Sequence, residues 1–245
     1  MTQYQEQIIK QLNSAGISIS QEAAGKLFSY YKMLVEKNES VNLTAITEFD
    51  DVVIKHFCDS LLVLNENVSR ETFLKNGVKI IDVGTGAGFP GIPLKIVLPG
   101  AHVTLLDSLS KRVDFLNEAV NALQEKDISA IHARAEDAAR SKQLRESFDI
   151  CVSRAVADLS VLAEYCLPFV KKGGVFIAYK SRDCDEEISA AKKAVEEMGG
   201  RIEEIKTATL PHTDIERKFV IIRKRSGTPD KYPRRAGTPV KKPIR

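Results

Sequence analysis

The 245-residue sequence predicts a doubly wound α/β domain that is preceded by helices and followed by a basic tail. Two observations predict this fold class. From Val78 onward, short runs of β-branched residues alternate with stretches of helical periodicity, and such alternation is typical of parallel strands joined by right-handed crossovers. A glycine-rich turn follows the first of these runs, at the position where open α/β sheets bind ligands.

Residues 1–66 are expected to form a helical extension that packs on the core. Apolar residues recur there at steps of three and four, which indicates amphipathic helices. Gly16 ends the first helix, and Ser20 can begin the second. A segment without periodicity follows at 41–47, and a further helix is expected over about 50–64.

The α/β core is expected to span residues 67–225. Its five parallel strands are predicted at 78–83, 102–107, 128–132, 148–153 and 174–180. Its crossover helices are predicted to include about 110–124, 160–170 and 185–198. Two further runs, at about 201–209 and 218–223, leave no room for a helix between them. They predict an antiparallel pair at one edge, which makes the Rossmann-like sheet seven-stranded.

The segment Asp82–Gly91, with the sequence DVGTGAGFPG, is the strongest local motif. Its glycines let the backbone take positive φ and approach a ligand closely. A dinucleotide site requires the spacing G-x-G-x-x-G, whereas here Gly88 comes one residue early and Phe89 occupies the place of the third glycine. A bulky side chain there would crowd a pyrophosphate but could form a wall for adenosine or methionine. The motif therefore favours S-adenosylmethionine over a nicotinamide dinucleotide.

Two carboxylates accompany the glycine turn. Asp107 ends the next predicted strand, where a carboxylate accepts hydrogen bonds from ribose hydroxyls. Asp82 ends the strand before the turn and suits the ammonium group of a methionine moiety. An equally good role for Asp82 is to cap the N–H groups of the turn itself.

Charge is distributed unevenly along the chain. Residues 217–245 contain eleven Lys or Arg and one acid, whereas residues 1–216 contain 25 basic and 32 acidic residues. A mildly acidic body with a basic end suggests a polyanionic partner. The segment 226–245 is rich in Pro, Gly and basic residues, so we expect a tail without regular structure. A tail that only aids solubility is the alternative.

Neither a metal site nor a membrane segment is expected. The four cysteines and four histidines have no spacing typical of metal ligands, and the cysteines are expected to be reduced and buried. The apolar runs are too short to cross a bilayer, and the N-terminus lacks the layout of a signal peptide. A cytoplasmic protein is therefore expected. A monomer is also expected, because no long apolar stripe requires a partner.

Several stretches resemble the bacterial RsmG (GidB) family. They are VNLTAI, HFCDS, DVGTGAGFPGIPLKI, LLDSLSKRVDFL, ARAED, SRAVADLSVL and YPRRAGTP, and the likeness extends from about Gly16 to the C-terminus. The resemblance implies a class I S-adenosylmethionine-dependent methyltransferase fold. It further implies methylation of guanine N7 in small-subunit (16S) ribosomal RNA, with S-adenosylhomocysteine as the second product. The substrate would be the small subunit or an assembly intermediate.

The resemblance also implies which residues bind the cofactor. The glycine turn would contact the methionine and ribose side, and Asp107 with its neighbour would hold the ribose. The ARAED stretch would face the adenine, and Arg154 would sit near the transferred methyl group. Together with Asp82, which its place at the strand end suggests, the candidate cofactor residues are Gly84, Gly86, Phe89, Asp107, Ser108, Ala135, Glu136 and Arg154.

RNA contacts are expected from polar residues at the same end of the sheet and from the basic tail. The candidates are Asn42, Thr44, Lys180, Arg217, Lys224, Tyr232, Arg234 and Arg235. Turn and cap formation is an equally good role for the first two. Lys111 and Arg112 are expected on the solvated side of their helix. Truncation after Arg225 is expected to weaken RNA binding and to leave cofactor affinity nearly intact.

The expected chemistry needs no general base, because guanine N7 carries a lone pair and no proton. Arg154 is the single catalytic candidate, through a substrate phosphate or guanine O6; a salt bridge that braces its loop is the alternative. Three other functions remain open at this point. They are a nicotinamide-dependent dehydrogenase, a non-enzymatic RNA-binding assembly factor, and a methyltransferase with another substrate.

Overall fold

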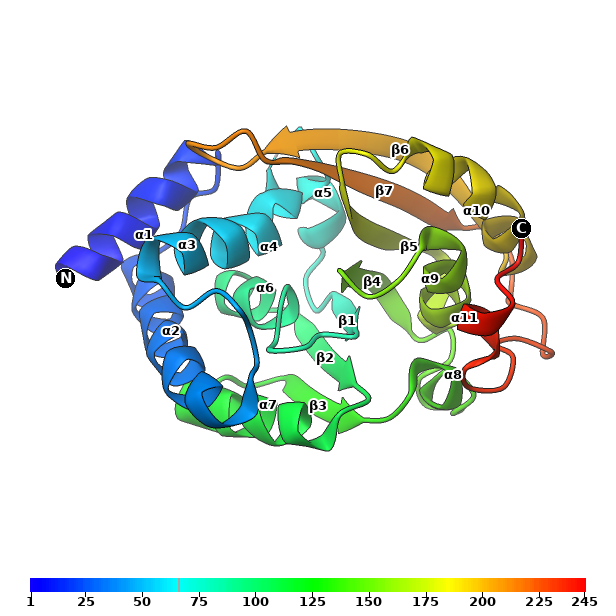
Figure 1. Ribbon diagram of the computed structural model, residues 1–245, viewed down its shortest axis with the longest axis horizontal. Helices are drawn as coiled ribbons and strands as arrows, with labels where there is room; N and C mark the ends of the chain where they lie inside the picture. Colours follow the sequence, from blue (N-terminus) through cyan, green and yellow to red (C-terminus); the bar gives the residue numbers. More distant parts are fainter. Residues whose placement is uncertain (66) are drawn as a thin grey trace.

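The computed structural model describes residues 1–65 and 67–245, and a seven-stranded sheet forms its centre (Figure 1). The strands are β1 Lys79–Val83, β2 His102–Asp107, β3 Ile128–His132, β4 Phe148–Arg154, β5 Val170–Ser181, β6 Gly200–Thr209 and β7 Glu216–Lys224. Their order is β3-β2-β1-β4-β5-β7-β6. The first five are parallel, and β7 pairs antiparallel with both β5 and β6. This arrangement confirms the predicted sheet and its antiparallel last pair.

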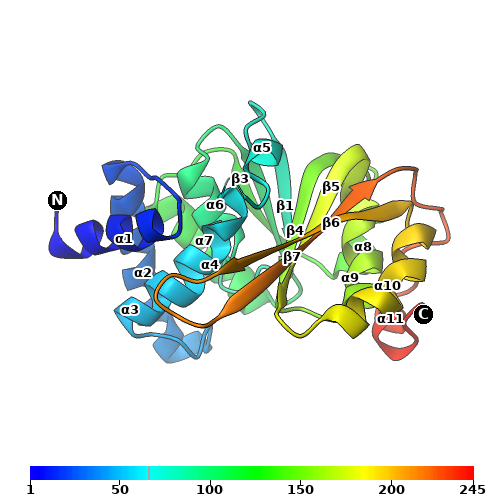
Figure 2. The ribbon, with the colours of Figure 1, turned by 90° about the horizontal axis from the view of Figure 1, so that it is seen from above.

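Helices cover both faces of the sheet (Figure 2), which is why the central strands are mostly apolar and buried. Successive side chains of a strand point to opposite faces. In β1, Ile80 packs with residues of α2 Gln21–Val41 and α6 Gly91–Val97, whereas Ile81 packs with residues of α9 Leu159–Cys166 and the helix after β5. Each face therefore has its own apolar core.

The helices divide between these two faces. The first face carries α1 Gln3–Ser14, α2, α6 and α7 Ser110–Ala122. The second carries α8 Ala135–Ala138, α9 with the short η3 Leu167–Phe169, and α10 Asp185–Glu197. The predicted starts of α2 and α7 are observed, and Ser20 accepts a hydrogen bond from the N–H of Ala23 at the start of α2.

The helix predicted over 50–64 is present but is not uniform. It consists of α3 Phe49–Val52, the π-helix η1 Val53–Cys58, α4 Asp59–Leu61 and the 3₁₀ turn η2 Leu62–Leu64, and α5 Arg70–Phe73 follows. A π-helical insertion changes which side chains share a face, and such insertions are frequent at functional sites. The expected end of the extension, residue 66, lies outside the described residues.

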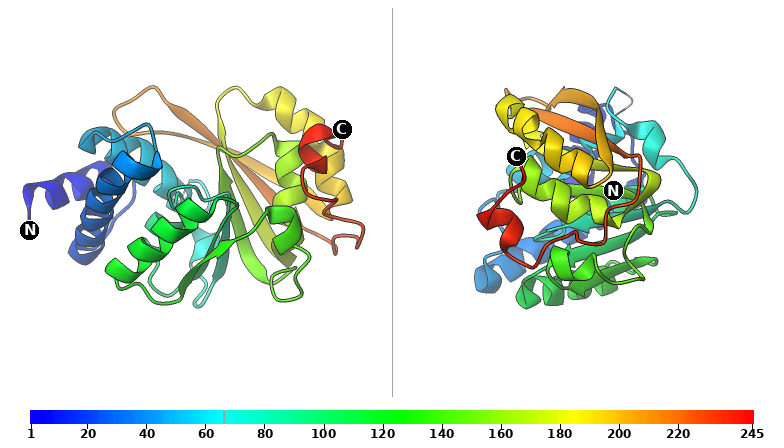
Figure 3. Two further views of the ribbon diagram at one scale, coloured as in Figure 1. Left: turned by 60° about the horizontal axis from the view of Figure 1, so that its bottom comes forward. Right: turned by 90° about the vertical axis from the view of Figure 1, so that its right-hand side faces the viewer.

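The tail 226–245 packs against the outer helices of the second face (Figure 3). It contains one helical turn, α11 Thr238–Lys241, which contacts α9. The expectation of a tail without regular structure is therefore wrong for this turn. The reason is tertiary, since the buried Tyr232 and Pro239 anchor a segment whose own composition disfavours a helix.

Within residues 1–65 and 67–245, no helix is long and apolar enough to cross a membrane. The same residues contain no cluster of three or more His, Cys, Asp or Glu side chains arranged to hold a metal ion. The four cysteines are buried free thiols.

Candidate active site at the carboxyl end of the sheet

A cavity of about 360 Å³ opens at the carboxyl ends of the parallel strands. Its walls come from the last residues of β1 and β2, from the segments that follow β1, β2, β3 and β4, and from one residue each of α7 and α9. They are Val83, Gly84, Leu106, Asp107, Ser108, Leu109, Arg112, Ala133, Arg134, Ala135, Glu136, Ala155, Val156 and Tyr165. Five of the nine predicted cofactor residues are among them, namely Gly84, Asp107, Ser108, Ala135 and Glu136. The cavity therefore lies where open α/β sheets bind their ligands.

The glycine turn is shaped by neighbours from distant parts of the chain. Gly88 has φ +102°, and a Cβ atom there would lie 2.6 Å from the hydroxyl oxygen of Tyr30 in α2. The same hydroxyl donates a hydrogen bond to the carbonyl of Ala87. A Cβ on Gly84 would lie 2.5 Å from Cγ2 of Val156, in the segment after β4. The early third glycine thus has a packing reason, because the N-terminal extension braces the turn.

Asp107 is held rigidly at the cavity wall. Its Oδ2 accepts a hydrogen bond from the N–H of Gly86 at 2.9 Å, and its Oδ1 accepts one from Leu109 at 2.9 Å. Arg112 Nη1 lies 3.6 Å from Oδ2. The expectation that Arg112 would lie on the solvated side of α7 is wrong, because this residue lines the cavity.

Asp82 is fully buried beneath the turn. Its Oδ2 accepts hydrogen bonds from the hydroxyl of Thr85 at 2.6 Å and from the N–H of Gly91 at 2.8 Å. Its Oδ1 is buried and has no partner in the described part of the chain. Burial raises the pKa of Asp82 to about 7, although the bonds from Thr85 and Gly91 oppose this rise. Asp82 thus caps the turn, and it retains one free acceptor.

Phe89 is placed differently from the expected cofactor wall. Its side chain is buried and does not line the cavity. Its ring stacks on the imidazole of His56 with a centroid distance of 4.5 Å. The guanidinium carbon of Arg154 lies 5.3 Å from the centroid of the Phe89 ring, within reach of a cation–π contact. Phe89 therefore supports Arg154.

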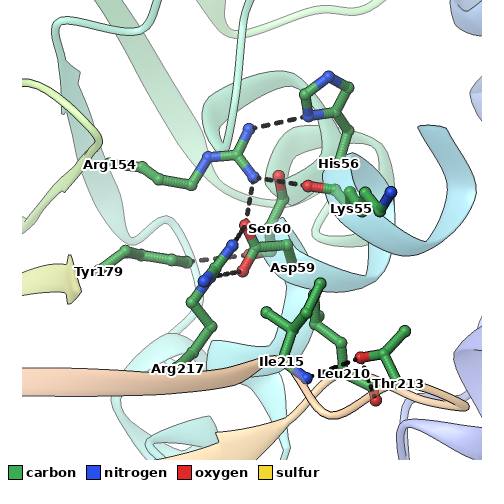
Figure 4. A network of polar contacts seen from close by, with 10 residues as sticks. All are labelled: Lys55, His56, Asp59, Ser60, Arg154, Tyr179, Leu210, Thr213, Ile215 and Arg217. Carbon is green, nitrogen blue, oxygen red and sulfur yellow. Dashed lines mark hydrogen bonds and ion pairs between the residues drawn. The ribbon is translucent and has the colours of Figure 1, made fainter. Parts of the chain in front are cut away.

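Arg154 belongs to a polar network next to the cavity (Figure 4). Its Nη1 donates to Oδ2 of Asp59 at 2.7 Å and to the carbonyl of Lys55 at 3.3 Å. Nε of Arg217 donates to the other oxygen of this carboxylate, Oδ1 of Asp59, at 2.7 Å. The salt bridge considered as the alternative role of Arg154 is therefore present.

His56 completes this network. Its Nδ1 lies 3.4 Å from Nη2 of Arg154, and its Nε2 lies 2.9 Å from the hydroxyl of Thr44. Burial, assisted by the charge of Arg154, lowers the pKa of His56 to about 4. The ring is neutral at pH 7, so Nδ1 accepts from the guanidinium and Nε2 donates to Thr44.

His56 and Asp59 are not among the predicted site residues, although both lie in the HFCDS stretch. One signal could have found them, because residues three apart on a helix share a face. The identity of their partners could not be found in this way. Arg154 and Arg217 are 95 and 158 residues away from Asp59.

The RNA candidates outside the tail are partly engaged within the protein. Asn42 is exposed and ends α2 in the left-handed conformation, with φ 51°. Thr44 contacts His56. Lys180 donates to the carbonyl of Ala157 at 2.7 Å and pairs with Glu187.

The basic residues near the C-terminus are used mainly for packing. Lys224 is fully buried and donates to the carbonyl of Leu167 at 2.7 Å, and burial lowers its pKa to about 8. Tyr232 is buried, and Arg234 pairs with Glu164 at 2.6 Å. Arg235 is exposed. The placement of Lys224, Tyr232 and Arg234 does not support direct contact with RNA.

The chain is similar to known proteins along most of its length. The family described as rRNA small subunit methyltransferase G (GidB) matches residues 23–218. The chain is 50% identical to ribosomal RNA small subunit methyltransferase G of Lachnoclostridium phytofermentans over 96% of each chain. It is 47% identical to the protein of the same name from Bacillus velezensis over 98% of each chain.

Among solved structures, M. jannaschii TYW2 in complex with AdoMet is similar in fold alone. It has a TM-score of 0.50 and 16% identity, and the match covers 63% of this chain and 73% of that chain. The sheet order and this likeness confirm the predicted class I methyltransferase fold. The chain belongs to the rRNA small subunit methyltransferase G family.

Proposed function

We propose that this protein transfers a methyl group from S-adenosylmethionine to N7 of a guanine in 16S ribosomal RNA. The observation that carries the proposal is the cavity beside the glycine turn, where the backbone holds the carboxylate of Asp107 in place. Family membership supports the reaction class and the ribosomal RNA substrate. The choice of N7 rests on the resemblance described above.

The residues present fit S-adenosylmethionine. Asp107 has acceptor capacity left on each oxygen for ribose hydroxyls, since a carboxylate offers about four lone-pair sites. Apolar groups of Leu106, Leu109 and Val156 line the same cavity and suit a purine ring. The unpartnered Oδ1 of Asp82 suits an ammonium group. When bound, S-adenosylmethionine supplies an electrophilic methyl group on a sulfonium.

The side chains near the cavity support a mechanism without a general base. Guanine N7 needs no deprotonation before it attacks a methyl group. Asp59 already accepts hydrogen bonds from two guanidinium groups, and His56 is occupied on both ring nitrogens. The protein then accelerates transfer by orienting the base and by excluding water. Arg154 binds either guanine O6 or a phosphate of the substrate.

In this proposal, the three parts of the chain have different tasks. Residues 67–225 form the catalytic core, 1–66 brace the glycine turn, and 226–245 close the outer side of the cavity. The partner is the ribosomal small subunit or an assembly intermediate, and RNA meets the surface around Asn42, Arg217 and Arg235. Two of the exposed large apolar side chains, Leu109 and Val156, line the cavity. The others among the described residues, Met1, Tyr4, Leu74, Ile205 and Val240, come from separate parts of the chain apart from the first two, which supports a monomer.

Mass spectrometry of 16S ribosomal RNA from cells with and without this protein tests the proposal. We expect the loss of one 7-methylguanosine, and its return when purified protein and S-adenosylmethionine are added to small subunits from the deficient cells. Unchanged RNA would overturn the proposed reaction. Binding to the subunit without methyl transfer would favour the non-enzymatic assembly factor instead.

A further inference from the structure

Asp59 joins two strands that are not neighbours in the sheet (Figure 4). Arg154 ends β4 and Arg217 lies near the start of β7, with β5 between these strands. The side chain of Asp59 is 2% exposed, whereas those of Arg154 and Arg217 are 13% and 24% exposed. Both guanidinium groups therefore converge on a buried carboxylate while keeping some access to solvent.

The three groups carry an excess of positive charge. One carboxylate faces two guanidinium groups, and the adjacent imidazole of His56 is neutral at pH 7. The cations around them each have an acid of their own. In the described part of the chain these pairs are Lys55 with Asp51, Lys180 with Glu187, Arg182 with Glu216, and Lys218 with Asp185. The excess charge is thus centred on Arg154 and Arg217.

Both guanidinium groups are held in place. Arg154 lies over the Phe89 ring and donates to the carbonyl of Lys55. Arg217 uses Nε and Nη2 for Asp59, at 2.7 and 3.3 Å, and a guanidinium has five N–H groups. Fixed, partly desolvated guanidinium groups match the oxygens of a phosphate group better than flexible lysines do.

Arg154 and Arg217 lie close to the cavity. Ala155 and Val156, which directly follow Arg154, line the cavity. An anion bound by the two arginines would therefore lie beside the cofactor cavity and outside it, since neither Arg154 nor Arg217 contributes to its walls.

We propose that Asp59 is a positioning residue, which holds Arg154 and Arg217 together as a receptor for one phosphate group of the RNA substrate. This inference rests on the proposed function and adds a subsite to it. Asp59 sets the spacing of the two guanidinium groups and neutralises one of them. The remaining positive charge binds the phosphate and so presents the neighbouring nucleotide to the cavity.

The variant Asp59→Asn tests this role, because it removes the charge and keeps the shape. The substrate is small subunits from cells that lack the protein. We expect KM for the subunits to rise about tenfold, as for loss of one charge-assisted contact. The slope of log KM against log salt should decrease by about 0.7 to 1, the contribution of one phosphate. The Kd for S-adenosylmethionine should stay within about twofold.

Asp149→Asn is a matched control at the opposite end of β4. Asp149 also faces two cations, with Nζ of Lys75 at 2.9 Å and Nζ of Lys171 at 2.5 Å. This variant should lower the melting temperature and leave KM and the salt slope unchanged. A purely structural role of Asp59 predicts the same behaviour for Asp59→Asn, and that result would overturn the inference.

Two further variants keep the test decisive if Asp59→Asn does not fold. Arg217→Gln leaves Asp59 paired with Arg154 and should show the same loss of salt slope, whereas Arg217→Lys should restore part of it. A wild-type salt slope in Arg217→Gln would overturn the inference.

Filter binding of 16S ribosomal RNA at several salt concentrations measures the salt dependence of affinity without catalysis. A wild-type protein that binds but does not methylate therefore contradicts the proposed function, and the comparison of variants is unaffected.

Discussion

The backbone N–H of Gly237 donates a hydrogen bond of 2.8 Å to Oε1 of Glu136. Glu136 is 4% exposed and lines the cavity, so the C-terminal tail reaches the wall of the cofactor site. The same tail supplies Arg234, which pairs with the buried Glu164. A segment that looks like a free basic arm in the sequence is therefore part of the folded structure.

Truncation after Arg225 should lower stability and cofactor affinity together. Glu164 would become a buried charge without a partner, which costs about 3 to 5 kcal/mol, and Glu136 would lose its anchor. Thermal unfolding and calorimetry with S-adenosylmethionine measure the two effects. The double variant Lys241→Ala and Lys242→Ala is the control, because it removes exposed charge and keeps the anchor. Unchanged cofactor affinity in the truncated protein would contradict this prediction. It would agree instead with the expectation from the sequence that the tail does not affect cofactor binding.

Cofactor affinity should depend on pH through Asp82. Its pKa of about 7 means that the carboxyl is increasingly protonated below pH 7, whereas an ammonium group prefers the ionised form. The affinity for S-adenosylmethionine should therefore rise as pH increases through 7 and level off above about pH 8. Calorimetry between pH 6 and 8, in buffers of different ionisation enthalpy, would detect the released proton. The variant Asp82→Asn should lack this dependence; an identical profile in both proteins would contradict it.

Stability should depend on pH through His56. The folded pKa is about 4 and the unfolded value is 6.5, so the unfolded chain binds more protons between these values. The stability contribution is complete above pH 6.5 and is lost as pH falls toward 4, by at most about 3 kcal/mol. Urea unfolding of wild type and His56→Gln at pH 7, 6 and 5 measures the difference. If the free energy of unfolding changed equally with pH in the two proteins, the pKa of His56 would not be lowered by folding.

Asp107→Asn should reduce the affinity for S-adenosylmethionine by about ten- to a hundredfold, the usual loss for a hydrogen bond to a charged group. The single amide oxygen can accept from only one of the N–H groups of Gly86 and Leu109, so the melting temperature should fall as well. Asp137→Asn removes an equal charge from the solvent side of α8 and serves as the control. Equal effects of the two variants on calorimetric affinity would indicate a general charge effect in place of a contact.

The strands, the main helices and the glycine turn follow from local patterns. Apolar residues recur every two positions in a strand and about every 3.6 positions in a helix, so residues close together in the sequence are enough to predict these elements. The positive φ of Gly84 and Gly88 is possible because glycine has no Cβ. Asp107 could also be predicted, because the end of the second parallel strand must lie beside the turn. The family followed from the same stretches of sequence.

The sequence by itself therefore determined the sheet, the glycine turn and the family. Tertiary structure alone decided that Phe89 supports Arg154, that Asp59 holds two arginines, and that the tail joins the cavity wall. The contacts of Asp59 and of the tail link residues that are about a hundred or more positions apart in the sequence. The contact between Phe89 and Arg154 spans fewer positions. The physical reason is that charge and hydrogen-bond partners depend on distance in space, which the order of strands and the packing of helices establish only after folding.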